Sequence, residues 1–211
     1  MSSLRKPFHY RNDNLVFILI GINVLVYLGQ MFLSRLNITS YLSLFPPAIV
    51  ARGWIWQFFT YMFVHDPRSP SHIIFNMLAL FIFGTRVESA MGSKEFLLYY
   101  MLTGVLAGFF SFVFYVLTGT WLVFLMGASG AIFAVQLAYA ALYPRSIIYI
   151  WGILPLRAPI MVLAFTVISL VSMITGFGGN VAHLTHLAGF GFGWLYFLVR
   201  FGVNPWREMR K

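Results

Sequence analysis

Cysteine is absent from this 211-residue chain, and charged residues are scarce. The lack of cysteine excludes thiol nucleophiles, disulfide bonds and thiolate metal sites, although it does not reveal the compartment. Charged residues make up only 9% of the sequence, whereas soluble domains carry about a quarter. Hydrophobic residues make up 60%, and several apolar runs are long enough to cross a hydrocarbon core of about 30 Å. The sequence therefore predicts an integral membrane protein.

The apolar runs predict six membrane-spanning helices and leave no room for a separate soluble domain. We therefore expect an all-α polytopic fold, a six-transmembrane-helix bundle that occupies residues 1–211 as a single membrane domain. The first run lacks a small-residue cleavage site and is long enough to span, which favours a retained helix over a removable signal peptide. The six spans are expected near residues 14–34, 72–91, 96–118, 127–142, 158–175 and 182–201.

Acidic residues are few, with 5 Asp and Glu against 14 Lys and Arg. In the six-span topology most basic residues fall on one side, and by the positive-inside rule this side and both termini face the cytoplasm. The net charge of +9 then reflects topology and contact with anionic lipid headgroups, and we expect the lipid bilayer and no nucleic acid as a partner. The basic residues on the inner side are Arg5, Lys6, Arg11, Lys94, Arg145, Arg157, Arg200, Arg207, Arg210 and Lys211.

The longest connection, residues 35–70, follows the first span and is rich in aromatic residues such as Trp54, Trp56 and Tyr61. Aromatic side chains at this density are typical of the membrane–water interface. The run over residues 54–64 is too short and too broken to span. We expect it to lie in the outer leaflet, between helices 1 and 2.

The fourth span is short, because residues 127–142 reach only about 24 Å at the helical rise. If the helix begins at the glycine-flanked Ser129, its start lies several ångströms below the outer surface. In the alternative, the helix begins at Trp121 and Ser129 lies in its middle. Gly127 and Gly130 weaken a continuous helix and suit a tight entry turn, which favours the short helix. Residues 121–126 are then expected to form a buried apolar loop.

Small residues recur at helical spacing on the third, fourth and sixth spans, and such faces allow close helix packing in lipid. Ordinary packing explains all of them without any chemistry. Near the serine we assign Gly127, Gly130, Gly189 and Gly193 to this packing role. The remaining members are Gly104, Gly108, Ala131, Ala134, Ala138 and Ala141.

Polar side chains within spans are costly in lipid and are functional candidates by default. Five of them fall at a similar depth near the outer side: Ser129, His72, Asn76, His183 and His186. His72 and Asn76 are four residues apart and share one helix face. This coincidence of depth carries more weight than any one residue, since a lone serine or histidine in a span is most often a packing or hydrogen-bonding group.

Ser129 is a candidate nucleophile that needs a base within hydrogen-bond reach. His186 is the favoured base, because it projects from the same face as the small residues of the sixth span, although His183 lies one turn away and remains an alternative. No carboxylate is expected at this level, since Asp66 lies in a loop and Glu88 near the inner end of its helix. The composition therefore permits a Ser-His dyad.

Hydrolysis also requires hydrogen-bond donors where negative charge develops on the carbonyl oxygen. The side-chain amide of Asn76, a ring N–H of His72 and the backbone N–H of Ser129 are candidate oxyanion donors, the last because a helix start leaves its N–H groups free. A metal site formed by His72, His183 and His186 is the competing interpretation. The sequence has no cysteine, no carboxylate at that depth and no His-Glu-x-x-His motif to support such a site, so we expect no metal.

With these residues assembled, the chain resembles the rhomboid intramembrane serine proteases. The resemblance covers nearly the whole chain, and its combination and order of motifs are more specific than any one motif. The motifs are Trp56-Gln57, His72-x-x-x-Asn76, Glu88-x-x-x-Gly92-Ser93, Gly127-x-Ser129-Gly130, Ala182-His183 and His186-Leu187-Ala188-Gly189.

The resemblance implies a six-helix bundle with a water-filled cavity that opens outward. It implies an endopeptidase in which Ser129 attacks a peptide bond, His186 acts as general base and then general acid, and His72, Asn76 and a backbone amide stabilise the oxyanion. Substrates would be transmembrane segments of other membrane proteins, cut at the extracytoplasmic side near small and helix-breaking residues. The family needs no metal or organic cofactor. It also suggests a minimal form in a prokaryotic plasma membrane.

Two departures from the family pattern concern the first loop. The usual Trp-Arg is Trp56-Gln57 here, which puts the contacts of that arginine in doubt. The turn with Pro67 and Pro70 before His72 is longer than expected. Two further functions stay open: a non-enzymatic protein that binds transmembrane clients in the same cavity, and a small-solute channel, although no charged or continuous polar lining is found below Ser129.

Overall fold

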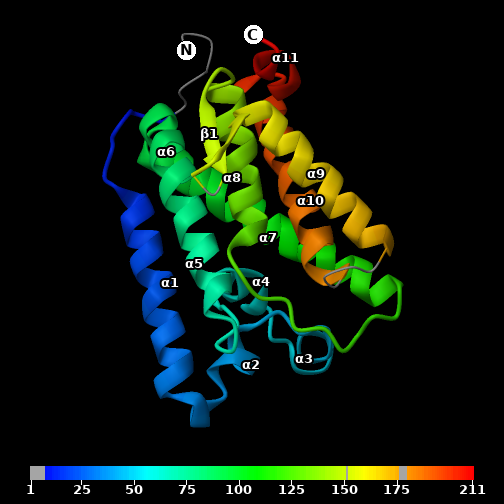
Figure 1. The fold of residues 1–211 in the computed structure, drawn as a ribbon. Helices are drawn as coiled ribbons and strands as arrows, with labels where there is room; N and C mark the ends of the chain where they lie inside the picture. The colour runs from blue at the N-terminus through cyan, green and yellow to red at the C-terminus, as the bar shows by residue number, and fades with distance from the viewer. Residues whose placement is uncertain (1–7, 151, 176–179) are drawn as a thin grey trace.

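The structure is a computed structural model that describes residues 8–150, 152–175 and 180–211, without the side chains of residue 34 and residues 180–182. Arg5 and Lys6 lie outside the described residues. Figure 1 shows a bundle of long helices, with the beginning of α1 and the end of the chain at the same end of the bundle.

The bundle helices are α1 (Leu15–Phe32), α5 (Pro70–Ala79), α6 (Thr85–Met91), α7 (Ser93–Leu117), α8 (Ser129–Leu142), α9 (Ala158–Thr175) and α10 (Asn180–Tyr196). Two π-helical segments continue these helices, η3 (Leu80–Gly84) between α5 and α6 and η4 (Phe197–Phe201) after α10. The short helices are η1 (Ser34–Leu36), α2 (Ile38–Leu42), α3 (Pro46–Arg52), α4 (Gln57–Thr60), η2 (Tyr61–Phe63) and α11 (Pro205–Met209). The strands are β1 (Ile147–Ile150) and β2 (Leu154–Arg157).

Four helical segments in the described part of the chain are long and apolar enough to cross a membrane. They are Leu15–Phe32, Pro70–Met91, Ser93–Leu117 and Ala158–Thr175. A shorter apolar helix, α8, lies among them. The chain is therefore a mostly helical integral membrane protein.

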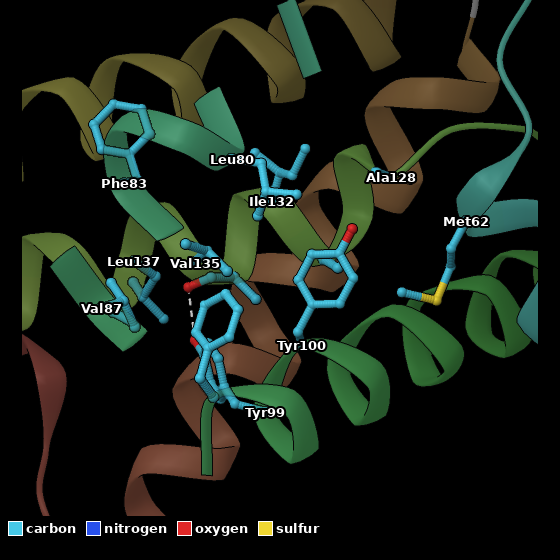
Figure 2. Close-up of a cluster of buried hydrophobic side chains, with 14 of the residues drawn as sticks. Met62, Leu80, Phe83, Val87, Tyr99, Tyr100, Ala128, Ile132, Val135 and Leu137 are labelled. Carbon is cyan, nitrogen blue, oxygen red and sulfur yellow. Dashed lines mark hydrogen bonds between the residues drawn. The ribbon is translucent and has the colours of Figure 1, made fainter. Parts of the chain in front are cut away.

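Helix α8 lies in the middle of the bundle, where α7, α9 and α10 pack against it (Figure 1). Its alanines are buried, and their short side chains allow the neighbouring backbones to come close. Figure 2 shows how Tyr99 and Tyr100 of α7 fill the space beside Ile132 and Val135 of α8. The Tyr99 hydroxyl donates a hydrogen bond to the carbonyl oxygen of Ala134 at 2.6 Å, so that this buried polar group is satisfied.

The end of the bundle at which α1 begins is held by a buried carboxylate. Glu88 accepts hydrogen bonds from the backbone N–H groups of Leu15 at 2.7 Å and Val16 at 3.0 Å. These are the first N–H groups of α1, which have no partner within the helix, and the carboxylate also complements the positive end of the helix dipole. Glu88 thus fixes the start of α1 against the end of α6.

The aromatic segment after α1 packs into the bundle instead of lying freely beside it. Tyr61, Met62 and Val64 are buried, and the two glycines of α7 that we had assigned to helix packing make room for them. A Cβ atom on Gly104 would lie 2.1 Å from Met62 Cε, and one on Gly108 would lie 2.5 Å from Tyr61 Cε1. The expectation that residues 54–64 lie in the outer leaflet therefore did not include the burial of several of them in the core of the bundle.

Gln57, for which the resemblance implies an arginine, is buried and connects two parts of the segment between α1 and α5, residues 33–69. Its side-chain oxygen accepts from the N–H of Phe45 at 3.0 Å, and its amide nitrogen donates to the carbonyls of Ser40 at 3.3 Å and Tyr41 at 3.1 Å. A neutral amide thus makes three contacts with the backbone of residues 40–45 without burying a charge.

The expectation of an all-α fold is wrong at one place. Between α8 and α9 the described residues form an antiparallel hairpin, in which Ile147 of β1 pairs with Arg157 of β2. The sequence Ile-Ile-Tyr-Ile is β-branched and aromatic, and Gly152 adopts the positive φ of +72° in the connection. A run this short cannot span, and its residue types favour a strand.

Candidate active site

Ser129 is the first residue of α8, which confirms the short fourth helix over the longer one that would begin at Trp121. Gly127 has a φ of +121°, a conformation that favours glycine and turns the chain into the helix. The connection before it is more exposed than predicted: Leu125 is buried, whereas Trp121, Leu122 and Phe124 are exposed. The expectation of a buried loop over residues 121–126 is therefore wrong.

The segment between α1 and α5 holds the start of α8 in place. Leu44 and Leu125 exchange two backbone hydrogen bonds, at 3.0 and 2.9 Å, and the N–H of Gly127 donates to the carbonyl of Tyr61 at 2.9 Å. The Tyr61 hydroxyl in turn donates to the carbonyl of Gly104 on α7 at 2.7 Å. The position of Ser129 therefore depends on three segments that are distant in sequence.

Ser129 and His186 are in direct contact. His186 Nε2 on α10 lies 2.8 Å from Ser129 Oγ on α8. The two helices approach closely because Gly189, one turn after His186, lies against Gly130. When Nδ1 carries the ring proton, Nε2 can accept the hydroxyl proton, which is the relation that a nucleophile and its base require.

Phe133 was not predicted to belong to the site. Its ring stacks on the imidazole of His186 with centroids 4.0 Å apart and an interplanar angle of 13°. Phe133 follows Ser129 by four residues, so both side chains lie on one face of α8. This spacing was visible in the sequence, but a phenylalanine in an apolar helix gives no signal that separates it from core residues. The stack restrains the rotation of the imidazole.

His72 faces the same place from α5. The N–H of Asp66 approaches His72 Nδ1 at 3.4 Å, an arrangement in which Nδ1 accepts and Nε2 carries the proton. A Cβ atom on Gly127 would lie 2.8 Å from His72 Nε2 and 3.9 Å from Ser129 Oγ. The absent side chain of Gly127 therefore leaves the space between the His72 N–H and the serine hydroxyl open.

Asn76 is buried one turn after His72, and its amide nitrogen donates to the carbonyl of His72 at 2.8 Å. This bond uses one of the two amide hydrogens and fixes the side chain along the helix. The ring of His183 lies beside that of His186, with centroids 5.9 Å apart, and its Nδ1 has no hydrogen-bond partner among the described residues. Among the described residues, His186 and not His183 is hydrogen-bonded to Ser129.

The fold and this site define a class: a helical membrane protein that brings a serine hydroxyl and a histidine ring together at the start of a short buried helix. Comparison with known families gives the same class, because the model of the Rhomboid domain matches residues 52–203. The chain belongs to the rhomboid family.

Curated relatives carry the same family name. The chain is 31% identical over 147 residues to the rhomboid protease GluP of Bacillus subtilis, and this match covers 67% of this chain and 25% of the relative. It is 30% identical over 104 residues to the rhomboid protease GlpG of Haemophilus influenzae, and this match covers 49% of this chain and 53% of the relative. A GlpG of Salmonella paratyphi A is 28% identical over 170 residues, 79% of this chain and 55% of the relative. The chain thus spans between a quarter and about half of the length of these relatives.

Proposed function

We propose that this protein is an intramembrane serine endopeptidase that hydrolyses peptide bonds in or near transmembrane segments of other membrane proteins. The contact of 2.8 Å between His186 Nε2 and Ser129 Oγ is the observation that carries the proposal. Membership of the rhomboid family and relatives named rhomboid proteases support it.

In the proposed reaction, Ser129 Oγ attacks the carbonyl carbon of the scissile bond while His186 Nε2 takes its proton. The imidazolium then gives this proton to the leaving amine, so that the C–N bond breaks and an acyl-enzyme remains. A water molecule attacks the acyl carbon with His186 again as base, and the proton returns to Ser129 as the ester is cleaved. His186 is thus base and acid in turn.

The oxyanion site is proposed to consist of the His72 ring N–H, the Asn76 amide and the Ser129 backbone N–H. His72 Nε2 points toward the space beside Gly127 and the serine, and the positive end of the α8 dipole lies at Ser129. For Asn76 the remaining amide hydrogen is the one available to substrate, since the other binds the His72 carbonyl. Loss of one such donor costs about 10²–10³ in rate.

The imidazole is held in this proposal without a carboxylate. No carboxylate oxygen is hydrogen-bonded to His186 within the part of the chain that the structure describes, and the ring of Phe133 lies parallel to it instead. Stacking of this kind contributes about 0.5–1.5 kcal/mol beyond the buried area. It orients the ring without stabilising the imidazolium as strongly as a charge would, which fits a Ser-His dyad.

We also propose the membrane topology. The four segments of spanning length, together with α8 and the continuous helix α10 and η4, give six crossings. The start of α1, the turn between α6 and α7, the end of α8 and helix α11 lie at one end of the bundle (Figure 1). The basic residues in or next to these segments are Arg11, Arg86, Lys94, Arg145 and Arg207. By the positive-inside rule this end faces the cytoplasm and Ser129 lies toward the extracytoplasmic side. We propose that the membrane is the plasma membrane of a prokaryote.

The test uses the purified protein in a bilayer with a reporter transmembrane segment. Ser129→Ala should abolish cleavage and labelling by a serine-reactive fluorophosphonate probe, because both need the activated hydroxyl. Ser172→Ala, which removes another buried serine hydroxyl on α9, is the matched control and should keep both. If the Ser129 variant cuts the reporter as well as the parent, the protease proposal is wrong; binding without cleavage by the parent would favour a client-binding protein.

The assignment of the base is tested separately. His186→Ala should remove cleavage as completely as Ser129→Ala, because dyad members act as a unit. His183→Ala should keep substantial activity, since its ring meets that of His186 at right angles and, among the described residues, His186 is the histidine hydrogen-bonded to Ser129. The opposite ranking of the two variants would assign the base to His183.

A further inference from the structure

The hairpin β1–β2 exposes apolar side chains on the face that points away from the bundle. Along β1, Ile148 and Ile150 pack toward the core, whereas Ile147 and Tyr149 are exposed. Ile153 in the connection is 83% exposed. A hairpin that faces water on one side alternates apolar and polar residues. Here Ile147, Tyr149 and Pro155 make most of the outer face apolar, and Arg157, which pairs with Ile147, adds a charge at the base of the hairpin. Most of the outer face is therefore not built for water.

The hairpin and its base carry different chemistry. Residues 146–156 contain no charged side chain, and exposed arginines stand directly before and after them, Arg145 and Arg157. The N–H of Ala158 bonds to the carbonyl of Ser146 at 3.1 Å and closes the base. Figure 1 shows the hairpin turning back from this base toward the middle of the bundle, where Ile148 and Ile150 pack against the core.

The base belongs to a region where basic groups outnumber free acidic ones. Arg145 donates to the backbone oxygen of Lys211 at 2.9 Å, which places the end of the chain beside it. Glu208 is engaged by Lys211 Nζ at 2.7 Å, and Glu88 and Glu95 are buried. The exposed charge around the hairpin base is therefore positive, which is complementary to anionic phospholipid headgroups.

The apolar surface of the hairpin is also continuous with the lipid-facing surface of α9. Ile160 and Leu163 are exposed in the first two turns of α9, which begins at Ala158 immediately after β2. From this continuity and from the charge pattern we infer that the hairpin is an interfacial anchor. Its apolar outer face lies in the leaflet on the side of the start of α1 and the C-terminus, and Arg145 and Arg157 contact anionic phospholipid headgroups.

Two opposing effects define the depth. Burial of Ile147, Tyr149 and Ile153 draws the hairpin into the leaflet, at about 25 cal/mol per Å² of apolar surface. A two-stranded sheet has unpaired backbone groups at both edges, which are costly in hydrocarbon, and the arginines stay with the headgroups. The hairpin therefore lies at the boundary of headgroups and acyl chains, where a tyrosine is also favoured. This inference is independent of protease activity.

The chain has no cysteine, so single labels can be introduced without removing native ones. The experiment measures the accessibility of a nitroxide label to oxygen and to a water-soluble nickel chelate in phosphatidylcholine bilayers that contain phosphatidylglycerol. Ile153→Cys is the test position. Leu25→Cys, in the middle of α1 and 69% exposed, is the hydrocarbon reference, and Arg210→Cys, exposed at the C-terminus, is the aqueous reference.

We expect an oxygen-to-nickel ratio at residue 153 that is several-fold above that at residue 210 and below that at residue 25. Tyr149→Cys should give the same order. A ratio equal to that of residue 210 would place the hairpin in water, and low accessibility to both reagents would show that protein covers it; either result overturns the inference. Removing phosphatidylglycerol should lower the ratio at residue 153, and Arg157→Gln should weaken this response. An unchanged ratio would refute the contact with anionic headgroups.

Discussion

Gly189 lies so close to Gly130 that a Cβ atom on Gly189 would be 2.0 Å from the Gly130 carbonyl oxygen and 2.9 Å from its carbonyl carbon. The contact joins α10 to α8 at the level where His186 meets Ser129. Backbone atoms stand on the other side of the gap, so no side chain can move away to make room.

Gly189→Ala should therefore push α10 from α8. We expect a loss of stability of about 1–3 kcal/mol, as for other overpacked sites, and a larger loss of reporter cleavage because the serine–histidine distance increases. The matched control is Gly191→Ala on the same helix, where an added Cβ meets nothing within 4 Å. Thermal unfolding and cleavage rates of the two variants check this. Equal behaviour of the two would mean that the close approach has no effect on the site.

The sequence predicted this part of the molecule well, because the relevant signals are local. The glycines flanking Ser129 indicate a helix start, and α8 begins there. Helical spacing puts His72 and Asn76 on one face, and Asn76 bonds back to the His72 carbonyl. Apolar length gave the helix boundaries to within a few residues, with α9 at Ala158–Thr175.

Other features depend on contacts between distant segments, and local patterns do not contain them. Leu44 pairs with Leu125, and only this pairing separates the buried Leu125 from its exposed neighbours. The stacking of Phe133 on His186 likewise needs the approach of α10 to α8. The hairpin is not predicted for a different reason: it lies between the expected spans 127–142 and 158–175, and apolar runs of four residues carry little periodicity.

The ring of Phe133 should orient His186 during catalysis. Phe133→Ala removes a stack worth about 1 kcal/mol, and we expect kcat to fall about fivefold while KM changes little. Phe133→Tyr keeps the ring and should keep most of the activity. Phe81→Ala, which removes an edge-on contact with Phe17, serves as the control and should leave kcat unchanged. A rise in KM without a fall in kcat would indicate that Phe133 contacts substrate instead of positioning the base.

Gln57 should be necessary for the stability of the segment between α1 and α5, because its side chain forms hydrogen bonds with backbone groups there. Gln57→Leu leaves the N–H of Phe45 without its acceptor, and a buried unsatisfied group costs about 1–3 kcal/mol. Gln136→Leu is the comparison, since Gln136 is also buried and its side-chain oxygen has no partner among the described residues. We expect a lower Tm for the Gln57 variant and an unchanged or higher Tm for the Gln136 variant. Similar values for both would show that the backbone contacts of Gln57 add nothing.

His65, in the connection between η2 and α5, should make the protein sensitive to acid. The side chain is buried, and neither ring nitrogen has a hydrogen-bond partner among the described residues. Its backbone is fixed by Gln30, which donates to the His65 carbonyl at 2.8 Å and accepts from its N–H at 3.1 Å. The ring meets that of His72 edge-on, with centroids 5.1 Å apart. Burial, and the neighbouring His72, lower the pKa of His65 from 6.5 to about 4.

Because this pKa is depressed in the folded state, the unfolded chain binds a proton at a higher pH than the folded protein does. The free energy of unfolding should therefore fall as the pH decreases from about 6.5 to about 4, by roughly 3 kcal/mol for this group, and the effect should level off below that range. His65→Phe keeps a ring and removes the titration, whereas His9→Phe changes an exposed histidine. Unfolding measured across this pH range should show a weaker acid dependence for the His65 variant alone. Parallel curves for the parent and His65→Phe would show that the acid sensitivity does not come from His65.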